Sequence, residues 1–142
     1  MKKLALMMVA AMITSLTFAQ KIQEKDVPLA VKRAFEKHYP NIKEVKWDKE
    51  EEKVEASFDL NKIDNSVLFD EKGYILETEV EIELNQLPKG ILEYVATNYK
   101  EQKVKEVAKI TDAKGIIFYE VEIKGLDLLF DSNGKFIKET KD

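Results

Sequence analysis

The chain has 142 residues, of which 44% are hydrophobic and 35% are charged, and its formal net charge at pH 7 is −4. A chain of this length and apolar content can bury a compact core of its own. The acidic balance argues against nucleic acid as a partner, because phosphate binding needs a basic face. The sequence contains no cysteine, which excludes disulfides, thiolate-bound zinc and lipid attachment at a cysteine.

The first element is the segment MKKLALMMVAAMITSLTFA, residues 1–19. Two lysines, an apolar stretch and small residues that end at Ala19 are typical of a secretory signal peptide. Hydroxyl residues interrupt the apolar stretch, so it is too short to span a bilayer. We expect cleavage between Ala19 and Gln20. The exported chain, residues 20–142, would then have a formal charge of −6 and no membrane span, and would be periplasmic or secreted.

An internal repeat organises the rest of the chain. VPLAVKRAFEKHY, residues 27–39, aligns with LPKGILEYVATNY, residues 87–99, at an offset of 60. VLFDEKG, residues 67–73, aligns with LLFDSNG, residues 128–134, at an offset of 61. Residues 55–58 align with residues 120–123 at an offset of 65. We assign repeat one to about residues 27–80 and repeat two to about residues 87–139, within one domain over residues 20–142, because no flexible linker separates them.

Each repeat begins with a helical pattern, in which apolar residues recur on one stripe and charged residues occupy the other side. The stripes are Val27, Val31, Ala34, Phe35 and His38 in repeat one, and Leu87, Ile91, Tyr94 and Val95 in repeat two. Pro28 and Pro88 are expected in the first turn, where a missing N–H costs nothing. Helices this short need a sheet to cover.

The sheet follows each helix. Alternating apolar residues predict strands around Val45 and Trp47, over residues 54–58, over residues 67–69 and over residues 74–84. Asp70 to Gly73 and Asp131 to Gly134 fit type I turns closed by glycine. The predicted fold class is therefore α+β, with two tandem repeats that each pack a helix on about four antiparallel strands.

One strand of repeat one carries an unusual row of acidic residues. Glu77, Glu79, Glu81 and Glu83 share one of its faces. Like charges about 7 Å apart repel unless lysines or a cationic ligand offset them. The row can be interpreted as a solvated face bordered by lysines, or as an acidic strip for a basic partner or a divalent cation.

The sequence indicates no catalytic set. His38 is the only histidine and lies at a helix end, where capping or packing is common. Asp131 could begin a calcium loop, but its twelfth position is Asp142 where a glutamate is needed. There is no glycine-rich phosphate loop and no nucleophile elbow. We therefore expect no enzymatic activity, no cofactor and no metal ligands.

Phe118 and Tyr119 are strand neighbours and must point to opposite faces. If helices cover one face of the sheet, one of these rings lies on the other face, which then offers a surface to a partner. The candidate binding surface comprises Trp47, Glu77, Glu79, Glu81, Glu83 and Phe118.

The order V-P-x-x-V-x-x-A-F-x-x-x-Y-P, V-x-W and F-D-x-x-G, followed by a second copy that ends Y-E-V-E-I and L-L-F-D-S-N-G-K-F, resembles the PepSY-like, beta-lactamase-inhibitor-like family. The resemblance extends from Val27 to about Glu139. It implies an exported protein of Gram-negative bacteria with a tandem fold and no known enzymatic activity. The second copy has no counterpart of Pro40 or Trp47, so the halves are not interchangeable.

Two functional hypotheses follow. The first is a non-catalytic exported binding or inhibitor-like module that presents a sheet face to an exported protein or peptide. The alternative is a periplasmic sensor that binds a small ligand or a cation at the acidic strand, residues 77–83. A hydrolase that uses a carboxylate pair ranks third. The sequence leaves the identity of the partner and the oligomeric state open.

Overall fold

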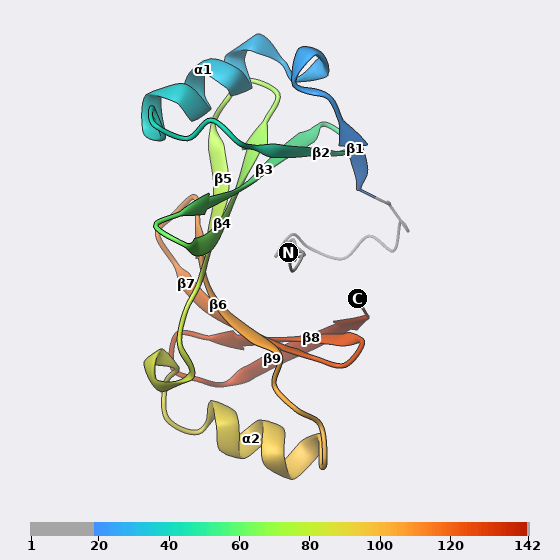
Figure 1. Cartoon of the computed structure of the whole chain (residues 1–142). Coiled ribbons are helices and arrows are strands. Elements are labelled where there is room, and N and C mark those ends of the chain that lie inside the picture. Colours follow the sequence, from blue (N-terminus) through green and yellow to red (C-terminus); the bar gives the residue numbers. More distant parts are fainter. Residues whose placement is uncertain (1–18, 142) are drawn as a thin grey trace. The chain divides into compact units, whose positions relative to one another are not determined.

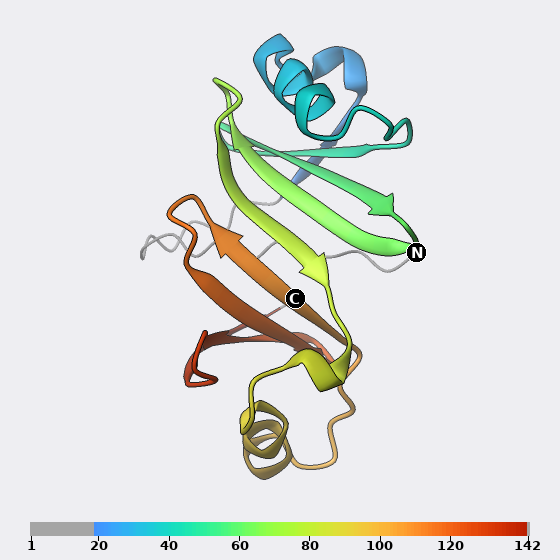
Figure 2. The same cartoon turned by 90° about the vertical axis from the view of Figure 1, so that its left-hand side faces the viewer.

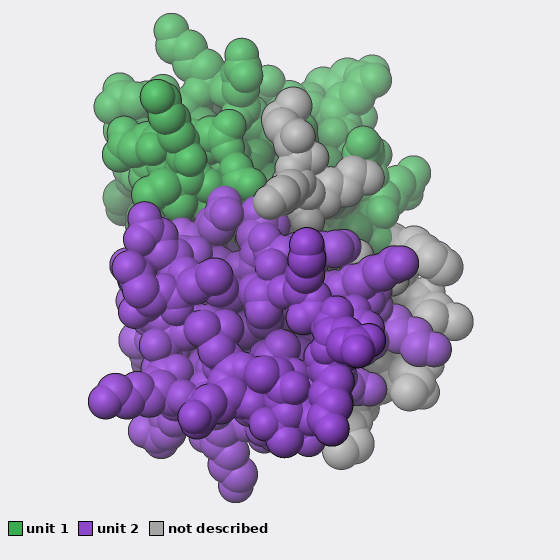
Figure 3. Space-filling model, turned by 60° about the horizontal axis from the view of Figure 1, so that its bottom comes forward, with its two compact units in different colours: residues 1–78 green, residues 79–142 purple. Residues whose placement is uncertain are grey.

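A computed structural model describes residues 19–141, so the predicted signal peptide up to residue 18 and the final Asp142 lie outside the described residues. The described residues form α-helices α1 and α2 and strands β1 to β9 (Figure 1). This confirms the predicted α+β class. The chain falls into two compact units, and the boundary between Thr78 and Glu79 lies inside β5 (Figure 3). No helix within residues 19–141 is long and apolar enough to cross a membrane.

The first unit contains β1 (Gln20–Ile22), α1 (Leu29–His38), β2 (Lys46–Glu50), β3 (Lys53–Leu60), β4 (Ile63–Asp70) and the beginning of β5 (Ile75–Glu81). A short 3-10 helix, η1 (Glu24–Asp26), links β1 to α1. From β1 to β4, each strand pairs antiparallel with the next. The sequence pattern missed β1, because three residues are too few to show an alternation.

The core of the first unit lies between α1 and one face of its strands. Val31 and Phe35 of α1 are buried in one cluster with Val54 and Phe69 of β3 and β4. Figure 1 shows α1 along one side of these strands. The helix ends at His38, where the Tyr39 N–H donates to the Phe35 carbonyl at 2.8 Å. Burial of the apolar stripe stabilises a helix too short to persist alone.

The second unit contains the end of β5, the 3-10 helix η2 (Leu84–Gln86), α2 (Ile91–Asn98), β6 (Glu106–Asp112), β7 (Ile117–Ile123), β8 (Leu126–Asp131) and β9 (Phe136–Lys141). From β6 to β9, each strand pairs antiparallel with the next. Ile91 and Val95 of α2 are buried with Val121 and Phe130 of the sheet. Figure 2 shows α2 end-on, at one side of these strands. Tyr94 of α2 stacks on Phe136, with ring centroids 5.0 Å apart.

The prolines lie slightly earlier than predicted. Pro28 is the N-cap of α1 rather than part of its first turn. In the second unit, α2 begins only at Ile91, because Gly90 before it adopts a left-handed φ of 93°. Pro88 therefore precedes α2 instead of opening it. This left-handed residue at the N-cap shortens α2 to 8 residues, against 10 in α1.

The two predicted turns, Asp70 to Gly73 and Asp131 to Gly134, are confirmed. The first of them also contacts α1. The Asp70 carboxylate accepts the backbone N–H groups of Lys72 at 2.9 Å and Tyr74 at 3.0 Å. Gly73 follows with φ of 85°, and a Cβ there would approach the Ala30 carbonyl oxygen of α1 to 2.6 Å. The turn thus requires glycine both for its backbone conformation and for its contact with α1.

Candidate binding surface of the second unit

The strands of the second unit have one face toward α2 and one face away from it. Val107, Val121 and Leu128 lie in the core cluster with α2. Neighbouring strand residues point the opposite way, and we call this opposite side the far face of the second unit. On β6, β7 and β8 its residues are Glu106, Ala108, Ile110, Asp112, Phe118, Glu120, Glu122, Asp127, Leu129 and Asp131. The far face therefore combines apolar residues with carboxylates.

The register groups the far-face residues into cross-strand pairs. Ile110 on β6 lies opposite Phe118 on β7, Ala108 lies opposite Glu120, and Glu106 lies opposite Glu122. On the other side of β7, Glu120 lies opposite Leu129 and Glu122 opposite Asp127. Directly opposed side chains lie about 5 Å apart and interact. The apolar pair thus borders the acidic pairs along the same two strands.

Exposure differs between these positions. Six of them are buried, at 0–6% exposure, while Phe118 and Glu122 are partly exposed; the buried ones are Glu106, Ala108, Ile110, Glu120, Asp127 and Leu129. The Lys105 ammonium lies 3.5 Å from the Glu122 carboxylate and is itself partly exposed. Ile110 and Leu129 therefore form the floor of the far face, and Phe118 and Glu122 are among its accessible residues.

The equivalent face of the first unit has a different chemistry. Its strands β2 and β3 pair Trp47 with Ala56 in the core, as β6 and β7 pair Val107 with Val121. The alternate pairs that point away from α1 are Lys46 with Ser57, Asp48 with Glu55, and Glu50 with Lys53. Lys46 and Lys53 thus occupy the positions of Glu106 and Phe118. The first unit has mixed charges where the second has carboxylates and an apolar pair.

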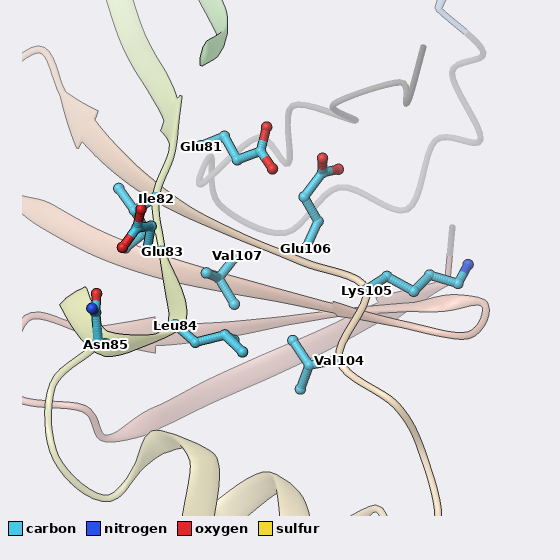
Figure 4. Close-up of a pocket in the computed structure, with 9 residues that line it drawn as sticks. All are labelled: Glu81, Ile82, Glu83, Leu84, Asn85, Val104, Lys105, Glu106 and Val107. Carbon is cyan, nitrogen blue, oxygen red and sulfur yellow. The ribbon is translucent and has the colours of Figure 1, made fainter. Parts of the chain in front are cut away.

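A pocket of about 480 Å³ lies beside Glu106 in the second unit. It is lined by Glu81, Ile82, Glu83, Leu84, Asn85, Val104, Lys105, Glu106 and Val107 (Figure 4). Carboxylate oxygens of Glu81 and Glu106 lie within 4.8 Å of one another, and Figure 4 shows these two groups close together at one end of the pocket. Two carboxylates at this distance could share a cation.

The acidic row differs from the solvated face considered above. Glu77 and Glu79 are buried, at 6% and 0% exposure, and Glu81 is half-buried. Glu83 lies beyond the end of β5 and is part of the capping box of η2, where its backbone N–H donates to the Gln86 Oε1 at 2.8 Å. The interpretation as a continuous exposed strip is therefore wrong. Only Glu81 and Glu83 line the pocket.

The two aromatic candidates have different positions. Trp47 is 7% exposed and belongs to the core of the first unit, with its ring edge-on to Phe35 at 5.4 Å. It is a packing residue and does not form part of an accessible surface. Phe118 lies on the far face of the second unit, whereas its neighbour Tyr119 packs against the α2 core.

One carboxylate of the first unit has a strongly shifted pKa. Burial and, to a smaller degree, the negative charges of Asp48 and Glu50 together raise the pKa of Glu55 to about 7. The hydrogen bond that the Ser57 hydroxyl donates to the Glu55 carboxylate at 3.3 Å acts in the opposite direction. Glu55 therefore titrates near neutral pH.

The family model described as "Putative beta-lactamase-inhibitor-like, PepSY-like" matches residues 16–77 and again residues 52–138. The chain belongs to this family. The two matches to a PepSY-like model are consistent with the internal duplication. No curated protein matches the sequence.

Solved structures show the same fold. A DUF2874 family protein from Bacteroides uniformis is 23% identical with a TM-score of 0.69, covering 80% of this chain and 88% of that chain. A BLIP-like protein from Bacteroides fragilis is 24% identical with a TM-score of 0.60, covering 79% and 84%. A protein from Bacteroides eggerthii, described as "putative periplasmic", is 17% identical with a TM-score of 0.70, covering 81% and 88%. At these identities the likeness shows the fold alone.

Of the far-face residues of β6, β7 and β8 in this PepSY-like chain, Phe118 alone was a sequence candidate, and Glu106, Ile110 and Glu120 are among those missed. A signal for them was present in the repeat. At the offsets of 60 and 65, Glu106 takes the place of Lys46, Ile110 the place of Glu50, and Phe118 the place of Lys53. Comparison of the copies on the face away from the helix would have found this change from mixed charge to acidic and apolar.

Proposed function

We propose that this PepSY-like chain is a non-catalytic, exported binding module, inhibitor-like in fold, that presents the far face of its second unit to a protein or peptide partner. The observation that carries the proposal is the partly exposed Phe118 ring, which lies opposite Ile110 on β6 and Asp131 on β8. An aromatic anchor next to charged groups is the composition that binding surfaces favour. The similarity to a BLIP-like protein supports a protein partner.

The proposed organisation is a tandem duplication in which each repeat supplies one helix and its strands. The first repeat would then be the scaffold copy and the second the binding copy, because the second has the aromatic Phe118 on the face away from its helix where the first has Lys53. Divergence of one copy at surface positions leaves the core of both repeats intact.

The proposed location is the periplasm or the extracellular space. The N-terminal segment has the charged, apolar and small-residue parts of a signal peptide. The description of the Bacteroides eggerthii protein as periplasmic supports the same compartment.

Site-specific cross-linking in cells tests the proposal. A photoreactive phenylalanine analogue replaces Phe118 on the far face, and in a control chain it replaces Leu92, which is 40% exposed on α2. We expect a discrete adduct with one protein or peptide at position 118 and none at position 92. The absence of an adduct at position 118, or the same adduct at both positions, would contradict the proposal.

A second candidate function is cation binding at the Glu81 and Glu106 carboxylates, which approach within 4.8 Å beside the pocket. Calorimetry with calcium and with magnesium tests it, together with the melting temperature. Binding that disappears in Glu81→Gln but persists in Glu83→Gln would support a sensor. If neither ion releases heat or raises the melting temperature, this candidate fails.

A further inference from the structure

We infer that Gln20 is a modification site: as the first residue of the exported chain it cyclises to pyroglutamate, and the resulting ring protects β1 from trimming. The inference rests on the proposed export, because it concerns the chain end that removal of the signal peptide would create. It follows from the residues beside the predicted cleavage and from the place of β1 in the first unit.

The predicted cleavage leaves a glutamine at the new N-terminus. Ala19 and, two residues earlier, Thr17 have the small side chains that such a cleavage site needs, and Gln20 follows directly. Ala19 and Gln20 are both exposed. After cleavage, Gln20 differs from an internal glutamine such as Gln23, because a free α-amine then lies in the same residue as the side-chain amide.

The ring closure takes place within Gln20. The neutral α-amine attacks the side-chain amide carbon Cδ, so that an N–Cδ bond forms and the Cδ–Nε2 bond breaks. The departing nitrogen takes up the proton that the amine releases and leaves as ammonia, so no other reactant is consumed. Two groups held in one residue react far more readily than the same groups on separate molecules. Because the Gln20 side chain is exposed, it can turn back toward its own amine.

The strand that begins at Gln20 is short and lies at an edge. β1 has 3 residues and is the first strand of the sheet, with β2 as its neighbour (Figure 1). Its last residue, Ile22, lies opposite Trp47 and packs against the core of the first unit. Gln20 and Lys21 are exposed, and Ile22 is half-buried. An enzyme that removes residues one by one from a free N-terminus would thus remove two exposed residues before it reached Ile22.

Loss of β1 would change the first unit in two ways. The core would lose the Ile22 side chain beside Trp47, and β2 would lose its backbone partners on that side. An uncovered strand edge tends to pair with other chains. Pyroglutamate has no free α-amine, which aminopeptidases require. The ring therefore protects Ile22 and keeps the edge of β2 covered.

Intact mass spectrometry of the mature protein tests the modification. The full-length chain, residues 1–142, carries a C-terminal tag and is purified from the periplasm and the medium of its native cells. We expect the mass of a chain that begins at Gln20, reduced by one ammonia. Stepwise N-terminal sequencing should fail until pyroglutamyl peptidase removes the first residue and frees Lys21. Gln20→Ala is the matched control, which should have its full mass and be sequenced directly.

Digestion with a broad-specificity aminopeptidase tests the protective role. The parent chain should remain intact, whereas Gln20→Ala should be shortened. As Ile22 is removed from that variant, the emission of Trp47 should shift to longer wavelength. The parent chain treated first with pyroglutamyl peptidase should behave as Gln20→Ala does.

The outcomes separate this inference from the proposed export. A mature chain that begins at Gln20 with its full mass, or that begins at a later residue, would overturn the inference and leave export standing. A chain that retains residues 1–19 would overturn both. Equal resistance of the parent and Gln20→Ala to the aminopeptidase would overturn the protective role of the ring.

Discussion

Ile110 on β6 lies directly opposite Phe118 on β7, on the side of the second unit that points away from α2. At the same place in the first unit, Glu50 lies opposite Lys53. An oppositely charged pair and an apolar pair each stabilise a sheet by about 0.2–1 kcal/mol, so either suits the scaffold. In the proposed function, the apolar pair also supplies an anchor for a partner, through the partly exposed Phe118 ring.

The contact between the Asp70 turn and α1 predicts a large cost for an added methyl group. Gly73→Ala must place its Cβ 2.6 Å from the Ala30 carbonyl oxygen while it keeps a φ of 85°. We expect the free energy of unfolding to fall by at least about 2 kcal/mol. Gly115→Ala is the matched control, because its φ is 82° and nothing lies within 4 Å of the new Cβ.

Gly115→Ala should lower the free energy of unfolding by only about 1 kcal/mol, because it adds the strain of a positive φ without a steric contact. Urea denaturation of both variants measures the difference. Equal losses in the two variants would show that the Gly73 turn does not pack against α1.

The raised pKa of Glu55 predicts a dependence of stability on pH. The folded chain holds the Glu55 proton up to about pH 7, whereas the unfolded chain releases it near its usual pKa of about 4.5. The folded state binds more protons between these values, so the contribution of Glu55 to stability is lost as pH rises through about 7. Glu55→Gln removes this loss.

We therefore expect Glu55→Gln to gain stability relative to the parent by on the order of 2 kcal/mol between about pH 5 and about pH 8. Urea denaturation at both pH values measures this gain. Asp48→Asn should lower the pKa of Glu55, since the Asp48 charge contributes to the shift. A stability difference between Glu55→Gln and the parent that is constant with pH would contradict the assignment.

A hydrogen bond joins Tyr99, the C-cap of α2, to Glu139 of β9 and predicts a raised tyrosine pKa. The Tyr99 hydroxyl donates to the Glu139 carboxylate, and burial together with this bond and the Glu139 charge raises the pKa of Tyr99 to about 12. Glu139→Gln should return that pKa toward its usual value, and Tyr99→Phe should cost about 1 kcal/mol of stability. Ultraviolet titration of tyrosinate measures the pKa, and an unchanged value in Glu139→Gln would refute the interaction.

Trp47 gives a fluorescence probe of the first unit, because it is the only tryptophan and lies in that core. Phe35→Ala removes the ring that contacts it edge-on at 5.4 Å and should shift the emission of the folded protein to longer wavelength, with a loss of about 3–5 kcal/mol of stability. Tyr94→Ala in the second unit should leave the emission unchanged. Equal shifts in both variants would contradict this placement of Trp47.

The sequence predicted the local elements well where a short-range pattern determines them. The apolar stripe with Val31 and Phe35 predicted α1, and the spacing of Asp70 and Gly73 predicted a turn. Both predictions succeed because helical period and turn chemistry depend on residues close together in the sequence. The alternation of side chains along a strand likewise predicted that Phe118 and Tyr119 point to opposite sides of β7.

Burial of the acidic row could not be predicted in the same way. Alternation says which residues share a face and gives no information about what surrounds that face. The carboxylates of Glu77 and Glu79 therefore suggested solvent, although both are buried. Trp47 was included in the candidate binding surface because the second copy has no tryptophan at that place. A residue that differs between the copies can equally lie in the core, and Trp47 does.

The most direct test of the binding surface is a nuclear magnetic resonance titration of the isotope-labelled protein with the protein or peptide that cross-links at position 118. The largest changes in amide chemical shift should fall on β6 and β7, around Ile110, Phe118 and Glu120, with little change at Asp48 and Glu55 of the first unit. Changes centred on α2 or on β2 and β3 would contradict the assignment of the binding surface to the far face of the second unit.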